Sequence, residues 1–213
     1  MSDAPVFVGG HSLGAARALL YAWSRLKRGK RVDGIYALAP PRPGDNYIGL
    51  NLAASPGVIV QSLKNRRDFV TNVPVDMKLI NERYEPAWPF TEVDEPGGPG
   101  LFGDHHIDLY QAGARKLPGI DASIQIAAAA DQIARLYDDR SEWDWLHDVD
   151  GEFCSMKIMP SGARLVIFRG SITALDWLDD FDARQILIMG ARVSEGFWRG
   201  VAAVQDLMDA QIA

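Results

Sequence analysis

The residue of this sequence best suited to chemistry is a serine held between two glycines. Ser12 lies in the segment 10–14, whose pattern Gly-x-Ser-x-Gly is typical of a sharp turn from a strand into a helix. Only small flanking residues fit such a turn, and amides at the start of the helix can stabilise an oxyanion. We expect Ser12 to act as a nucleophile, with the amide of Leu13 as an oxyanion donor. An ordinary helix cap is the alternative for Ser12.

A serine hydroxyl becomes a useful nucleophile when a histidine takes its proton. The chain has four histidines. We expect His11 to point away from the serine hydroxyl that it adjoins, and His147 to lie where a surface helix ends. His105 and His106 follow a stretch rich in proline and glycine, which could carry a base over the edge of a sheet. The base is therefore expected at one of these two residues.

The histidine in turn needs a carboxylate, and α/β-hydrolases place it between the serine and the histidine in chain order. Asp68 fits this order and follows a predicted strand at 58–63. Parallel sheets place functional residues at this end of their strands. Asp45 and Asp76 are the alternatives. The sequence favours Asp68.

The elements that must position these residues alternate between strand and helix. Apolar runs and periodicity predict strands at 6–9, 32–39, 58–63, 152–159, 164–168 and 184–189, and helices at 13–26, 107–116, 123–138 and 197–212. A turn at 160–162 predicts a hairpin, and residues 86–103 are expected to form a long loop. This alternation is typical of an α/β fold, with a mostly parallel sheet covered by helices on both faces.

Composition restricts the class of protein. The 213 residues, 47% of them hydrophobic, are enough for one domain spanning 1–213. A net charge of −6 gives no reason to expect nucleic acid as a partner, and no apolar run reaches the roughly 18 residues of an integral membrane segment. The single cysteine and the absence of a recognisable signal peptide favour the cytoplasm, with export left open. Nothing in the sequence indicates an oligomeric state.

Several motifs together resemble those of the class 3 (fungal-type) lipase family. They occur in the family's order and are the segment 10–14, the turn 41–45, Asp68 with Val70 and Pro74, and Asp104-His105 followed by Tyr110. The resemblance implies an α/β-hydrolase fold and carboxylic ester hydrolysis by Ser12, Asp68 and His105. His106 remains the second candidate for the base. The implied substrate is a small-molecule or lipid ester, and the reaction requires no metal or organic cofactor.

The second half of the chain resembles other parts of the same family. Residues 165–171, followed by Asp176-Trp177, resemble the family's oxyanion strand and lid, which implies that Ser171 is the second oxyanion donor. The apolar residues of this lid segment are Ile172, Leu175, Trp177 and Leu178. Without the resemblance, the same pattern would favour plain core packing.

These segments follow the nucleophile, whereas in the family they precede it. The resemblance therefore implies a circular permutation, in which 1–116 corresponds to the family's C-terminal half and 123–213 to its N-terminal half. The residues themselves agree, because one short strand before Ser12 leaves no upstream segment to supply the second oxyanion amide. The permutation predicts that Ala213 and Met1 lie near each other, because in an unpermuted chain the helix ending at Ile212 would lead directly into the strand at 6–9.

Two other functions share these features. An acyltransferase or thioesterase would use the same triad and differ in the acceptor that resolves the acyl-enzyme. A binding module could keep the fold without catalysis. The presence of every triad residue type in its place disfavours the binding module. The sequence does not distinguish short-chain from long-chain esters.

Overall fold

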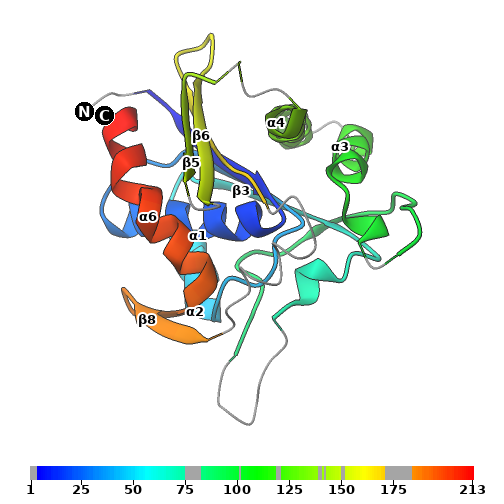
Figure 1. Ribbon diagram of the computed structural model, residues 1–213, viewed down its shortest axis with the longest axis horizontal. Helices are drawn as coiled ribbons and strands as arrows, with labels where there is room; N and C mark the ends of the chain where they lie inside the picture. Colours follow the sequence, from blue (N-terminus) through cyan, green and yellow to red (C-terminus); the bar gives the residue numbers. More distant parts are fainter. Residues whose placement is uncertain are drawn as a thin grey trace.

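The centre of the computed structural model is a seven-stranded sheet in the order β4-β3-β2-β1-β7-β6-β5 (Figure 1). The structure describes residues 4–74, 83–100, 102–118, 121–138, 141, 143–149, 152–170 and 184–213. The strands are β1 (Val6–His11), β2 (Gly34–Leu38), β3 (Ile59–Asn65), β4 (Thr91–Val93), β5 (Trp145–Val149), β6 (Glu152–Ile158) and β7 (Arg164–Phe168). Neighbours from β4 to β7 pair in parallel, and β6 runs antiparallel to both β7 and β5.

The central strands are buried because both faces of the sheet are covered. In β7 the side chains alternate: Val166 and Phe168 belong to one buried core, and Leu165 and Ile167 to the other. This alternation follows from the period of two in an extended strand. Every residue of β2 is buried, as is typical of a central parallel strand.

Helices cover the two faces of the sheet (Figure 1). The helices are α1 (Leu13–Lys27), α2 (Asn46–Ala53), α3 (Ile107–Lys116), α4 (Asp121–Asp138) and α6 (Glu195–Ile212). The first core contains Trp23 of α1 and Phe197 of α6, and the second contains Tyr110 of α3 and Ile133 of α4. Among the described residues, no helix combines the length and apolar character needed to cross a bilayer.

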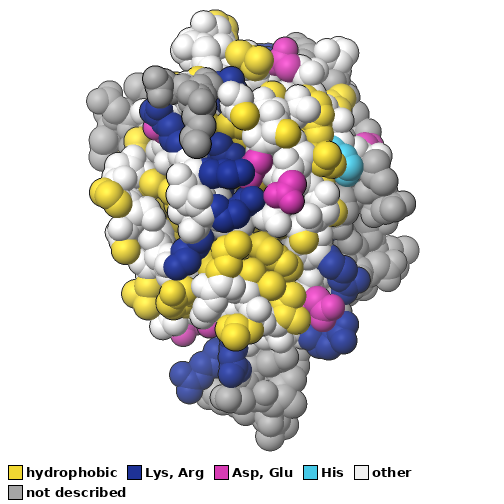
Figure 2. Space-filling model, turned by 90° about the vertical axis from the view of Figure 1, so that its left-hand side faces the viewer, with side chains coloured by type: hydrophobic (Ala, Val, Ile, Leu, Met, Phe, Trp, Pro, Cys, Tyr) yellow, Lys and Arg dark blue, Asp and Glu magenta, His cyan; other side chains and the backbone are white. Residues whose placement is uncertain are grey.

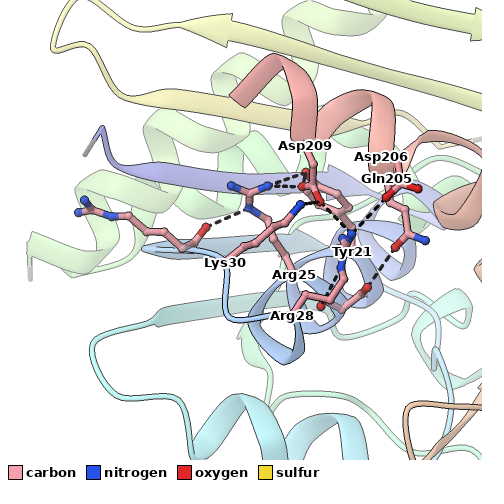
Figure 3. Close-up of polar contacts among 9 residues, drawn as sticks. Tyr21, Arg25, Arg28, Lys30, Gln205, Asp206 and Asp209 are labelled. Carbon is pink, nitrogen blue, oxygen red and sulfur yellow. Dashed lines mark hydrogen bonds and ion pairs between the residues drawn. The ribbon is translucent and has the colours of Figure 1, made fainter. Parts of the chain in front are cut away.

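A buried carboxylate joins α6 to α1. Asp209 accepts hydrogen bonds from Tyr21 and Arg25, lies 2.9 Å from Nη1 of Arg28, and accepts from Nζ of Lys30 at 2.6 Å (Figure 3). Its side chain is only 4% exposed, so these donors satisfy a charge that burial would otherwise penalise. Basic and acidic side chains also lie side by side on the surface of this part of the molecule (Figure 2).

The predicted α/β fold is confirmed. The structure has helices where the periodicity predicts them, and the hairpin β6–β7 turns at 160–162 with Gly162 at φ +81°. The predicted strand at 184–189 corresponds to β8 (Gln185–Ile188), which pairs with β9 (Ala191–Ser194) in a separate two-stranded sheet.

Some local predictions were wrong. The predicted loop at 86–103 contains β4, three residues long, which pairs with the end of β3. His147 lies in β5, opposite Cys154 of β6, and not at the end of a helix. The short helix α2 was missed; Asp45 caps it by accepting from the Tyr47 amide at 3.1 Å. The two strands are short, and pairing with distant residues decides whether such segments become strands.

Segments from the two ends of the chain lie next to each other in the fold. Although β7 follows Ser12 by more than a hundred residues, it pairs directly with β1, with Gly9 opposite Ile167. Residues 30–33 contact both the end of α6 and the start of β1. Lys30 donates to Asp209 of α6, and the Asp33 amide donates to the Val6 carbonyl at 2.8 Å. The circular permutation and the assignment of its halves stay predictions.

Candidate active site

Ser12 occupies a strained turn between β1 and α1. Its backbone has φ +60° and ψ −133°, a region that residues with side chains rarely adopt. The Ser12 amide donates to the carbonyl of Leu38 at 2.9 Å, and its carbonyl accepts from the Ala15 amide at the same distance. Such strain at a turn that aims a hydroxyl is typical of a functional site.

The two glycines of the motif are needed for close backbone approach. A Cβ on Gly10 would lie 2.4 Å from the Gly14 carbonyl oxygen, and one on Gly14 would lie 2.1 Å from the Phe168 carbonyl oxygen. Real Cβ atoms do not approach so closely. Strand β7 therefore packs directly against the turn, and no larger residue fits at either position.

The fold brings Ser12, His105 and Asp68 together from three separate elements. Oγ of Ser12 lies 2.7 Å from Nε2 of His105, and Nδ1 of His105 lies 2.6 Å from Oδ2 of Asp68. The carboxylate requires Nδ1 to carry the proton, which leaves the lone pair of Nε2 facing the serine hydroxyl. This arrangement allows the histidine to accept the proton of Ser12.

The three side chains are shielded from water. The exposed fractions are 4% for Ser12, 1% for Asp68 and 8% for His105. Ser12 follows β1, Asp68 follows β3, and His105 ends the 3₁₀ helix η3 (Gly103–His105). Strands β1 and β3 point in the same direction, so their carboxyl ends meet at one edge of the sheet.

The buried carboxylate of Asp68 has donors besides His105. The hydroxyl of Tyr110 donates to Oδ2, and the amide of Val70 donates to Oδ1 at 2.9 Å. The Tyr110 oxygen also accepts from the amide of Asn65 at 3.0 Å. Burial and the negative charge of Asp68 raise the pKa of Tyr110 well above its usual value, so the phenol stays protonated and can donate.

A buried asparagine anchors the loop that carries His105. The side-chain amide of Asn65 donates to the carbonyls of Glu95 at 3.0 Å and Asp104 at 3.2 Å, and its oxygen accepts from the Glu95 amide at 3.2 Å. Asp104 in turn accepts from the Gly97 amide at 3.1 Å. The segment before His105 is thus tied to the end of β3, close to Asp68.

The alternative residues lie elsewhere. His106 is exposed at the start of α3, and among the described residues no hydrogen bond joins its ring to Ser12 or Asp68. Asp45 caps α2 and accepts from the Arg192 amide at 3.0 Å. The remaining predicted residues lie outside the described part of the chain, namely Asp76, Ser171, Ile172, Leu175, Trp177 and Leu178.

The turn at Ser12 supplies one candidate oxyanion donor. The amide of Leu13 lies in the first turn of α1, where backbone N–H groups lack partners within the helix. In the part of the chain that the structure describes, no group of three or more His, Cys, Asp or Glu residues could hold a metal ion.

Two residues near the triad had no predicted role. The ring of His11 is 6% exposed and lies beside the ring of His105, with centroids 4.8 Å apart. Tyr137 of α4 also contacts His11, and its hydroxyl oxygen lies 3.3 Å from Nδ1 of His11. Since the two residues are 126 positions apart, no local pattern could have revealed the contact.

One family of known proteins matches part of the chain. A family model described as lipase (class 3) matches residues 1–78. The matched region runs from β1 to beyond β3, and it includes Ser12 and Asp68. A search among curated proteins finds no match to the chain.

Proposed function

We propose that the chain is a class 3 lipase, the family whose model matches residues 1–78, and that it hydrolyses carboxylic esters through an acyl-enzyme on Ser12. The family supports activity of the lipase and esterase type and a lipid ester as the substrate class. The observation that carries the proposed mechanism is the pair of short contacts at His105, 2.7 Å to Oγ of Ser12 and 2.6 Å to Asp68.

In the first half of the proposed reaction, Oγ of Ser12 attacks the carbonyl carbon of the ester while its proton passes to Nε2 of His105. The carbonyl π electrons move to oxygen and form an oxyanion. Asp68 stabilises the imidazolium that results, because the proton on Nδ1 is held by the carboxylate. The imidazolium then gives the proton from Nε2 to the leaving alkoxide oxygen as the ester C–O bond breaks.

In the second half, water attacks the acyl-enzyme and loses its proton to Nε2 of His105. The tetrahedral intermediate collapses, the bond from the acyl carbon to Oγ breaks, and the proton returns to Ser12. The products are the free acid and the original enzyme.

The oxyanion requires donors that are already in place. We assign one to the amide of Leu13 and the second to Ser171, the latter from the resemblance of the segment that follows β7. Each such donor typically contributes on the order of 10² to 10³ in turnover. Ile172, Leu175, Trp177 and Leu178 are assigned to a lid over the acyl chain on the same basis.

Hydrolysis of p-nitrophenyl esters of several chain lengths tests the proposal. Ser12→Ala should lose at least about a thousandfold in turnover while keeping the circular dichroism spectrum of the wild type. A fluorophosphonate should label the wild type and leave Ser12→Ala unlabelled. Undiminished hydrolysis by a folded Ser12→Ala protein would contradict the mechanism.

The same assay separates hydrolysis from acyl transfer. With a small alcohol added, a hydrolase continues to release mostly free acid, whereas an acyltransferase diverts most of the acyl groups to the new ester. The ratio of the two products, measured by chromatography, decides between them.

A further inference from the structure

A chain of hydrogen bonds near Ser12 links Gly170, which follows β7, to the main chain of His105. The amide of Gly170 donates to the hydroxyl oxygen of Tyr137 at 3.1 Å. The Tyr137 hydroxyl lies 3.3 Å from Nδ1 of His11, and Nε2 of His11 lies 2.9 Å from the carbonyl oxygen of His105.

The partners determine the direction of every bond in this chain. A carbonyl oxygen only accepts hydrogen bonds. Nε2 of His11 must therefore carry a proton, which it donates to the carbonyl oxygen of His105. In a neutral ring Nδ1 is then an acceptor, and it receives the hydroxyl proton of Tyr137. The Tyr137 oxygen keeps a lone pair for the Gly170 amide, so each group donates and accepts consistently.

The burial of both side chains supports these protonation states. Desolvation lowers the pKa of His11 well below its ordinary value, and the nearby charge of His105 lowers it further. Burial raises the pKa of Tyr137 to about 12. At neutral pH the histidine is therefore uncharged and the phenol is protonated.

Both ends of this series of hydrogen bonds lie next to Ser12. A Cβ on Gly170 would lie 2.9 Å from Cβ of Ser12, so Gly170 packs directly against the serine. The next residue in sequence is Ser171, which is assigned above as an oxyanion donor. At the other end, the ring of His11 lies at 31° to the ring of His105, with the ring centroids 4.8 Å apart.

We propose that His11 and Tyr137 are positioning residues of the site, holding the main chains of Gly170 and His105 at fixed places next to Ser12. The inference rests on the proposed ester hydrolysis. A neutral His11 suits this role, because a proton on its ring would place a second positive charge 4.8 Å from the His105 imidazolium during the reaction. The hydrogen-bond chain therefore supplies rigid support without adding charge.

Tyr137→Phe tests the proposal most directly, since it removes one oxygen and keeps the ring. We expect kcat to fall about tenfold with KM within twofold, because small displacements of catalytic groups reduce turnover more than binding. Tyr36→Phe is the matched control: its hydroxyl binds Gln125 at 3.3 Å, outside the described site, and it should keep kcat within twofold. An unchanged kcat in Tyr137→Phe overturns the proposal.

His11 provides a second test with a rescue. His11→Leu removes both hydrogen bonds and should lower kcat on the order of a hundredfold. His11→Gln keeps an amide that can donate to the His105 carbonyl, and it should recover part of the lost kcat. Equal kcat values for the leucine and glutamine variants would overturn the role of the bond to His105.

Nuclear magnetic resonance gives a readout that does not depend on activity. The ¹⁵N shifts of the His11 ring, assigned by their loss in His11→Gln, should show the proton on Nε2 at pH 7. A proton on Nδ1 would overturn the hydrogen-bond chain. If the wild type shows no Ser12-dependent hydrolysis, the proposed function fails, whereas the tautomer of His11 still tests the chain separately.

Discussion

The hydroxyl of Tyr110 donates to Oδ2 of Asp68, the same carboxylate oxygen that faces Nδ1 of His105. Oδ2 of Asp68 thus accepts two hydrogen bonds, and the bond from Tyr110 fixes the position of the carboxylate relative to His105. Because Tyr110 is fully buried and Asp68 is 1% exposed, water does not replace either donor readily.

Removing this hydroxyl tests its contribution. In Tyr110→Phe we expect kcat to fall about tenfold and the free energy of unfolding to fall by about 2 kcal/mol, the range for a hydrogen bond to a charged group. The Asn65 amide also loses its acceptor in this variant. Ester hydrolysis and urea unfolding measure the two effects, and an unchanged kcat would show that the bond to Tyr110 is dispensable for turnover.

The two adjacent histidines should differ sharply. His105→Ala is expected to lose at least about a thousandfold in turnover, the scale of removing a triad member. His106→Ala should stay within a few-fold of the wild type, because the exposed ring of His106 is not hydrogen-bonded to Ser12. Steady-state hydrolysis by both variants measures the difference, and the reverse outcome would exchange their roles.

Asp68→Asn should reduce turnover by about 10⁴-fold, since an amide at this position favours the wrong histidine tautomer. Asp45→Asn is the matched control, because Asp45 follows the neighbouring strand and caps α2. It should keep turnover and lose at most about 1 kcal/mol of stability. Comparable losses of turnover in the two variants would argue against Asp68 as the partner of His105.

The contact between the turn and β7 predicts intolerance at Gly14. A methyl group there would meet the Phe168 carbonyl at 2.1 Å, so we expect Gly14→Ala to lose about 3 kcal/mol or more. Gly98→Ala is the control, because a Cβ at Gly98 meets nothing within 4 Å, and it should change stability by no more than about 0.5 kcal/mol. Thermal unfolding of both variants measures the difference, and wild-type stability in Gly14→Ala would contradict the predicted clash.

The ion cluster between α1 and α6 should make stability depend on pH. Burial alone would raise the pKa of Asp209, but hydrogen bonds from Lys30 and Tyr21 and the charges of Arg25 and Arg28 outweigh it and hold the pKa below its usual value (Figure 3). A lowered folded-state pKa contributes stability above the unfolded value, about 3.9 for aspartate, and this contribution is lost as pH falls through the folded value.

Asp209→Asn should therefore cost about 3 kcal/mol at pH 7, because it leaves buried cations without their counter-charge. The difference from the wild type should shrink as pH falls below about 4. Asp206→Asn, whose side chain is 88% exposed, should cost no more than about 0.5 kcal/mol. Urea unfolding between about pH 3 and pH 7, a range that includes the unfolded-state pKa of aspartate, measures the stability of both variants. A difference between Asp209→Asn and the wild type that stays constant across this range would contradict the predicted pH dependence.

Much of the fold could be predicted because its signals are local. The apolar runs of β1, β2 and β3 and the periodicity of α1, α3 and α6 depend only on neighbouring residues, and the structure has these elements. Strands β4 and β5 were missed, because their pairing with β3 and β6 depends on residues brought near by the fold. Their own sequences are too short to specify a strand.

The sequence by itself indicated the turn at Ser12, because the Gly-x-Ser-x-Gly pattern is typical of a sharp turn from a strand into a helix. The contact with β7 that excludes a larger residue at Gly14 came from the tertiary structure. The sequence also narrowed the partners of Ser12 to a few aspartates and two neighbouring histidines. Only the tertiary structure decided that His105, rather than His106, lies 2.7 Å from the serine, and that Tyr137 reaches His11 from α4. Hydrogen bonds of this kind require side chains to be aligned within a few tenths of an ångström. Such alignment is set by the packing of helices on the sheet and not by any local pattern.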